Sequence, residues 1–289
     1  MVAAGVSILL HGLAYAMILY IISVGLAVTM GLLRFINLAH GVFAMAGGYV
    51  TVTLMNAHGV PFGVALLLAF AGVALVSVAL ERFLYSRLYG GVEMELEQVL
   101  FTIGLIFMAS AMVRYFWGSL PQHLHLPPAL AGQIDLWVRT FPAYRAFLIG
   151  VSLVVVLALW LGIERSNFGA QVRAAVDNPR MAESLGINTR RLFTFTFALG
   201  SGLAAFGGGL GADMLAIHPG YAFEYLVYFL IVVSIGGLGS VRGPFVAALL
   251  IGISDTAFKY LVPQLGSSFI FIALIALLLW RPQGLFARG

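Results

Sequence analysis

ERSNFGAQVRAAVDNPRMAESLGINTRR, residues 164–191, is the longest polar run in a chain that is otherwise strongly apolar. It holds five of the 15 Lys and Arg residues of the protein. Apolar segments long enough to cross a bilayer flank it on both sides, which predicts a loop between two membrane spans. Because loops rich in arginine stay on the cytoplasmic side of a membrane, we expect this loop in the cytoplasm.

The loop carries the signals of a helix of about two turns, from Pro179 to Leu185. Asn178 is a good N-cap, and proline suits the first helical position. Gly186 is a typical C-terminal stop. Met181 and Leu185 lie four residues apart and therefore share one apolar face. A helix this short is not stable alone in water, so it needs a surface to pack against.

Two interpretations of this short helix remain open. It either lies on the protein's own membrane domain or docks a cytoplasmic partner, and the pattern favours docking. The residues that would form the docking element are Asn178, Pro179, Arg180, Met181, Glu183, Leu185 and Gly186.

The composition determines the class of protein. The chain has 289 residues, of which 62% are hydrophobic and 9% charged, and its mean hydropathy is +1.04. A soluble domain is about 25% charged. The sequence therefore predicts an all-α, polytopic membrane protein, with residues 1–289 as a single membrane domain. The absence of cysteine excludes disulfides and thiolate metal sites.

We expect about eight or nine membrane spans, two of them interrupted, at residues 34–41 and 236–244. Backbone that leaves a helix at membrane depth must be buried in protein or line a cavity. The interruptions are therefore candidate gates. Glycines within the later spans favour close helix packing over pore lining, but they are kept as pathway candidates. The candidate gate or pathway residues are Asn37, His40, Gly41, Gly207, Gly208, Gly236, Gly237 and Gly239.

The charges support an orientation. With the 164–191 loop inside, eleven of the 15 Lys and Arg residues fall on the inner side and four on the outer side. This bias puts the N-terminus outside and the C-terminus inside, if both interruptions reach the cytoplasmic side; a re-entrant first interruption would change that parity. The net charge of +4 then reflects orientation and not nucleic-acid binding.

The chain lacks the motifs of an enzyme. The only lysine, Lys259, follows Phe258, so no phosphate-binding loop of the GxxxxGK type exists. No nucleophile motif or metal-ligand cluster stands out, so we expect no metal site and no catalytic residues. Glu224 and Asp255 lie near span ends, where an interfacial position is the simplest expectation. The lack of a mid-span acid argues against a proton- or sodium-driven carrier.

Four ordered blocks resemble the permease subunits of bacterial branched-chain amino acid ABC importers, of the LivH type. They are NLAHG at 37–41, the block at 173–191, GGLGS at 236–240 and RPQGLF at 281–286. The resemblance implies a multi-pass subunit of the bacterial inner membrane that is not itself an enzyme. The partners it implies are a second, LivM-type permease, two cytoplasmic ATPases that bind ATP and Mg, and a periplasmic binding protein.

In ABC importers, a short helix in the main cytoplasmic loop couples the permease to the ATPase, and the resemblance gives this role to the helix at Pro179. The implied solute is a branched-chain amino acid. Urea, short amides and aromatic or other carboxylic acids remain alternatives within the same importer class. A self-sufficient secondary carrier is a weaker alternative.

The loop after the fourth predicted span has two interpretations. It carries Trp137, Phe141 and Tyr144 beside Arg139 and Arg145. Aromatic residues with arginine are common anchors of protein contacts, which would suit a binding protein. They are equally typical of the aromatic belt at a membrane interface.

Overall fold

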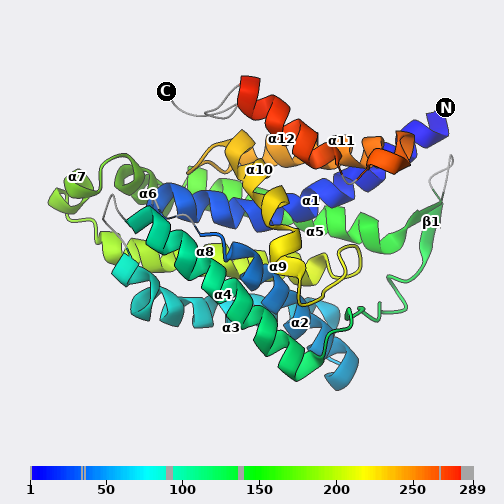
Figure 1. Ribbon diagram of the computed structural model, residues 1–289, viewed down its shortest axis with the longest axis horizontal. Helices are drawn as coiled ribbons and strands as arrows, with labels where there is room; N and C mark the ends of the chain where they lie inside the picture. Colours follow the sequence, from blue (N-terminus) through cyan, green and yellow to red (C-terminus); the bar gives the residue numbers. More distant parts are fainter. Residues whose placement is uncertain are drawn as a thin grey trace.

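The computed structural model describes residues 2–33, 35, 37–88, 94–135, 140–266 and 268–280 (Figure 1). The predicted all-α architecture is confirmed, because the described chain is a bundle of helices with one two-stranded hairpin. The 281–286 block and residues Arg34, Trp137 and Arg139, which entered the predictions, lie outside the described residues.

The first helix is the centre of the bundle. Helix α1 (Val2–Leu33) is the most buried of the helices of membrane-spanning length. It packs against α5 (Ala143–Leu159), α8 (Thr189–Leu210), α10 (Leu226–Gly236) and α11 (Arg242–Leu261). It is apolar on all sides, as expected for a helix that other helices surround.

The second layer lies on the other side of α8. There α8 contacts α2 (His40–His58) and α3 (Phe62–Phe83), and α3 continues into a short 3-10 turn, η1 (Tyr85–Leu88). Helix α4 (Met94–Trp117) runs across the front of the bundle in Figure 1. Large apolar side chains such as Leu75 and Leu100 are exposed on α3 and α4, which suits a surface that faces lipid.

Six helices of the described chain are long and apolar enough to cross a bilayer. The other three predicted spans are also helical, as α2, α10 and α12 (Phe269–Trp280). At 1.5 Å per residue, α10 and α12 reach only about 17–18 Å, well short of a bilayer core of roughly 30 Å. The total of eight or nine spans therefore stays a prediction.

The first predicted interruption is present and buried. The chain leaves the helix after Leu33 and resumes it at His40, and Phe35, Asn37 and His40 are all buried. The His40 Nε2 atom lies 3.0 Å from the carbonyl oxygen of Ile22. At 1.5 Å per residue, Ile22 lies about 6 Å from the midpoint of the apolar segment Ala4–Leu32. The chain therefore turns back on itself, and α2 begins near the middle of the bundle.

The second interruption lies beside the end of α1. Helix α10 ends at Gly236 and α11 begins at Arg242. Between them, Gly237 and Gly239 have φ angles of 81° and 73°, a conformation that glycine adopts without strain. The backbone N–H of Gly239 donates a hydrogen bond of 2.9 Å to the carbonyl of Ala27.

The helices after the 164–191 loop repeat the arrangement of the first three. The pairs α1–α11 and α3–α8 have the most extensive contacts in the bundle, and α10 packs on α11 as α2 packs on α3. In each half, a short helix starts inside the bundle: α2 after the first interruption, and α9 (Tyr221–Glu224) followed by α10 after the loop from α8. The two starts meet, because the backbones of Gly41 and Ala222 are in contact.

The remaining segments lie at opposite ends of the bundle. Strands β1 (Gln133–Asp135) and β2 (Thr140–Pro142) form the hairpin near the N-terminus in Figure 1. Helices α6 (Asn167–Asp177) and α7 (Pro179–Ser184) lie at the other end.

Gly208 provides a test of this packing. A Cβ at Gly208 would collide with the carbonyl oxygen of Ala44, whereas one at Gly72, on the exposed side of α3, would meet nothing. We expect Gly208→Ala to destabilise the protein by about 1–3 kcal/mol, because overpacked sites cost roughly this much. Gly72→Ala should be neutral or stabilising by up to about 1 kcal/mol, since alanine is the better helix former.

The measurement is the thermal midpoint of both variants in the same detergent. Equal midpoints would contradict the close contact of α2 and α8.

Candidate functional site

The entry to the 164–191 loop is a rigid corner. Helix α5 ends in one wide π turn, η2 (Trp160–Glu164), and α6 begins directly after it. The Ser166 hydroxyl caps α6 by accepting the N–H of Gly169 at 3.1 Å. Arg173 donates from Nη1 to the carbonyl of Ile163 at 2.8 Å, which ties α6 back to the end of α5.

Helix α6 was missed by the sequence prediction, although its signals are present. Ser166 is a preferred N-cap residue. Phe168, Val172 and Val176 recur at a spacing typical of one helix face. The many polar residues of the loop concealed this amphipathic pattern.

The predicted helix at Pro179 exists as α7. The Asn178 carboxamide oxygen accepts the N–H of Met181 at 3.1 Å, and Gly186 has the left-handed φ of 83° that ends the helix. Leu185 is the residue that closes the helix, one position beyond its last helical residue. The Glu183 side chain accepts a hydrogen bond of 2.5 Å from the hydroxyl of Thr189, which fixes α7 to the start of α8.

One side of helix α7 packs against the bundle, and another side is exposed. Ala182 is 1% exposed and lies in a small apolar cluster with Leu32 of α1 and Leu192 of α8. Met181 and Leu185, in contrast, are 58% and 73% exposed. Their apolar side chains do not pack on the membrane domain of this chain. Docking, the favoured interpretation, stays a prediction with this exposed pair as its physical basis.

The corner before α6 also contacts the second interruption. Glu164 forms an ion pair with Arg242, the first residue of α11. The guanidinium of Arg242 lies 6.0 Å from the ring of Trp160, and that of Arg165 lies 4.6 Å from the same ring. The loop that carries α7 and the break between α10 and α11 therefore share side-chain contacts.

The candidate gate residues of the first interruption come together. The Asn37 carboxamide oxygen accepts a hydrogen bond of 3.2 Å from the hydroxyl of Tyr85. Asn37, His40 and Gly41 are buried where α1, α2 and α9 meet. The candidates of the second interruption form a separate group: Gly236 touches Gly243, and Gly239 touches the backbone of Gly31 near the end of α1.

Gly207 and Gly208 lie in tight helix contacts. A Cβ at Gly207 would press on Ile22, and one at Gly208 would collide with Ala44. This is the packing use that the sequence favoured, and a pathway role for these two glycines stays a prediction.

The described aromatic residues of the loop after α4 pack inside the protein. Phe141 and Tyr144 are buried, and the Tyr144 hydroxyl donates a hydrogen bond of 2.6 Å to the carbonyl of Leu210. Arg145 contacts the ring of His11. The described part of the predicted outer anchor is therefore used inside the chain, and neither buried aromatic ring is free to contact a binding protein or a membrane interface.

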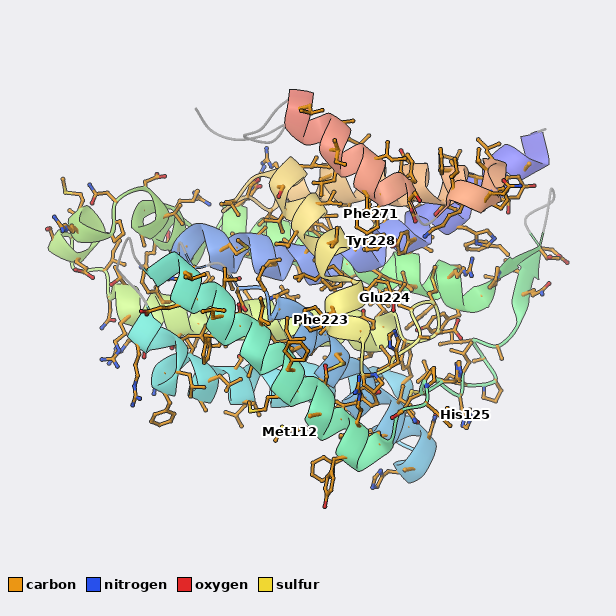
Figure 2. The ribbon with its side chains drawn as sticks, in the orientation of Figure 1. Met112, His125, Phe223, Glu224, Tyr228 and Phe271 are labelled. Carbon is orange, nitrogen blue, oxygen red and sulfur yellow. The ribbon has the colours of Figure 1, made fainter. Side chains whose placement is uncertain are left out.

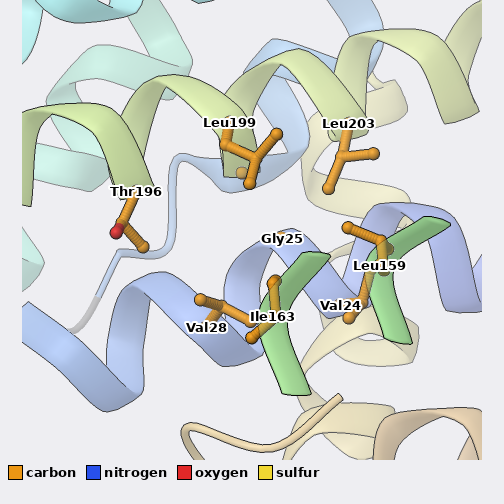
Figure 3. A pocket seen from close by; sticks show the side chains of 9 residues that line it. Val24, Gly25, Val28, Leu159, Ile163, Thr196, Leu199 and Leu203 are labelled. Atoms are coloured by element: carbon orange, nitrogen blue, oxygen red, sulfur yellow. The ribbon is translucent and has the colours of Figure 1, made fainter. Parts of the chain in front are cut away.

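A small cleft opens between α1, the end of α5 and α8 (Figure 3). It has a volume of about 10 Å³, and Thr196 is the only residue with a polar side chain in its lining. The lining has no group that could pair with a charged solute. The cleft is lined by Val24, Gly25, Val28, Leu159, Ile163, Thr196, Leu199, Gly200 and Leu203.

A helical bundle with two interrupted segments, and a short helix outside it that exposes an apolar pair, has the architecture of a membrane permease subunit. The comparisons with known proteins agree. Residues 8–279 match the family model described as branched-chain amino acid transport system / permease component, and the chain belongs to this family.

Three relatives illustrate the relationship. The permease protein BraD of Pseudomonas aeruginosa is 30% identical over 97% of this chain and 95% of its own length. LivH of Escherichia coli K12 is 29% identical over 93% and 91%. LivM of the same organism is 28% identical over 46% of this chain and 32% of its own length. No solved structure matches the chain.

The cap of α7 can be tested directly. Asn178→Ala removes the acceptor for the Met181 N–H, which should cost about 1 kcal/mol of local helix stability. Amide hydrogen exchange at residues 181–186 should then be about fivefold faster. Asn178→Asp keeps the acceptor and Asp177→Ala alters a neighbour outside the cap, so both should exchange as the unmodified chain does. Unchanged exchange in Asn178→Ala would show that the cap does not stabilise α7.

Proposed function

We propose that this chain is a permease subunit of a binding-protein-dependent ABC importer, and that it moves branched-chain amino acids across the bacterial inner membrane. The observation that carries the proposal is the exposed apolar pair Met181 and Leu185 on a capped helix outside the bundle. Such a pair is suited to a partner that works on the membrane domain from the cytoplasm. Membership of the permease family supports the same assignment.

The proposed partners follow from this role. A second permease of the LivM type would complete the membrane domain, and the similarity of this chain to LivM supports a pair of related subunits. Two cytoplasmic ATPases would bind ATP and Mg and drive the cycle, and a periplasmic binding protein would deliver the solute. This chain would itself bind no cofactor.

The names of the relatives favour branched-chain amino acids as the solute. Urea, short amides and carboxylic acids are the alternatives within the same importer class. A self-sufficient carrier would instead take up solute along an ion gradient, without ATP. Uptake of leucine by vesicles that contain the whole importer, measured with ATP and with an ion gradient alone, separates these functions.

Leu185→Asp tests the coupling role of α7. The side chain is 73% exposed, so the variant should fold and insert normally. A charge placed in an apolar contact with the ATPase would cost about 3–5 kcal/mol if that contact is buried. We therefore expect uptake and solute-stimulated ATP hydrolysis to fall by at least about a hundredfold.

The matched control is Gln171→Asp, which puts the same charge on an exposed position of α6 in the same loop. It should leave transport unchanged. Normal coupling of ATP hydrolysis to uptake in Leu185→Asp would refute α7 as the coupling helix.

A further inference from the structure

A carboxylate lies on the surface of the bundle near mid-height. Glu224 closes the short helix α9, and its side chain is 55% exposed. Two residues before it, Ala222 touches Gly41 at the start of α2, and that start is fixed to the middle of α1 through His40. Four residues after it, the ring of Tyr228 lies 6.4 Å from that of Tyr15, which is also near the middle of α1. Glu224 therefore lies at the start of its predicted span, but this start is far from both ends of the bundle, which argues against the expected interfacial position.

His218 is the hydrogen-bond partner of the Glu224 carboxylate. Its Nδ1 accepts the N–H of Gly220 at 3.1 Å, so in the neutral ring the proton is on Nε2. Nε2 lies 2.9 Å from a carboxylate oxygen of Glu224 and donates to it. Among the described residues, the second carboxylate oxygen has no hydrogen-bond partner.

Aromatic residues lie next to Glu224 in the chain and one turn beyond it. Phe223 is half exposed, and its ring lies 5.2 Å from that of Phe107 on α4. Tyr225 follows Glu224 in the chain, and its ring lies 5.9 Å from that of Tyr228. Figure 2 shows Phe223, Glu224 and Tyr228 together near the centre of the viewed face, between α4 and the upper helices. An anionic group and an apolar wall therefore lie side by side.

Contact with lipid hydrocarbon is unfavourable for this surface. An ionised side chain in the hydrocarbon region costs several kcal/mol, so such residues face protein or a water-filled cavity. The neighbouring acid, Asp255, follows the same rule, because it is buried and its carboxylate lies 2.7 Å from the ammonium of Lys259. Among the described residues, Glu224 pairs only with the imidazole of His218, and its second carboxylate oxygen is open to a further partner. It is suited to a cation that arrives and leaves.

We propose that Glu224 binds the α-ammonium group of the solute as the solute passes the middle of the membrane, while Phe223 and Tyr228 contact its apolar side chain. The inference rests on the proposed function, because an amino acid carries both groups. A carboxylate–ammonium hydrogen bond is charge-assisted and is worth about 1.5–3 kcal/mol, whereas urea, amides and carboxylic acids have no ammonium to place there. The permease would then contribute to selection instead of only conducting what a binding protein delivers.

Glu224→Gln tests this role, because the carboxamide oxygen still accepts the hydrogen bond from His218 and only the charge is lost. The assay is leucine uptake by the complete importer in proteoliposomes, with its binding protein at saturating concentration. We expect the turnover to fall on the order of tenfold to a hundredfold. The concentration of loaded binding protein that gives half-maximal uptake and the basal ATP hydrolysis should not change. The matched control is Glu97→Gln, which removes an exposed carboxylate near the start of α4. This variant should have wild-type turnover.

The outcomes separate the possibilities. Wild-type turnover in Glu224→Gln would overturn the inference and leave the proposed function intact. Loss of the second permease from the purified Glu224→Gln complex would show that the carboxylate pairs with a cation of that subunit, which also overturns the inference. A wild-type importer that takes up no amino acid would overturn both the inference and the proposed function.

Discussion

The bundle depends on direct backbone contact between helices at positions without side chains. Gly25 meets Gly200 where α1 crosses α8, and Gly47 meets Ala205 where α2 crosses it. Inside a bilayer, lipid solvates leucine as well as protein does, so helices gain little from hiding apolar side chains. They gain by close approach, which multiplies van der Waals contacts. Since α8 is held between α1 and α2 in this way, the first interrupted segment can be buried inside the bundle.

Enclosure imposes a strict condition on the interruptions, because every backbone polar group there needs a partner from the protein. Two of the observed bonds attach the breaks to α1. His40 reaches the carbonyl of Ile22, and Gly239 donates to that of Ala27. Any movement that breaks either attachment would have to replace a bond to α1.

Local signals in the sequence were sufficient for the features that local chemistry determines. Asn178, Pro179 and Gly186 specified α7, and the polar and glycine-rich interruptions specified both breaks. The depth of Glu224 could not be predicted in the same way, because it depends on a chain reversal that brings Ala222 against Gly41. Similarly, Tyr144 looked like an interfacial anchor, but its hydroxyl is bound to Leu210 of α8, far along the chain. The depth or burial of a residue that depends on contacts between distant helices cannot be predicted from the residues next to it in the chain.

The central position of α1 affects how the protein must be made. This helix is made about two hundred residues before its neighbour α11, which begins at Arg242. Gly12 and Ala16 pack against α11 in the finished protein, so during synthesis they wait for that neighbour. A nascent chain that stalled before α11 would leave part of its own core uncovered.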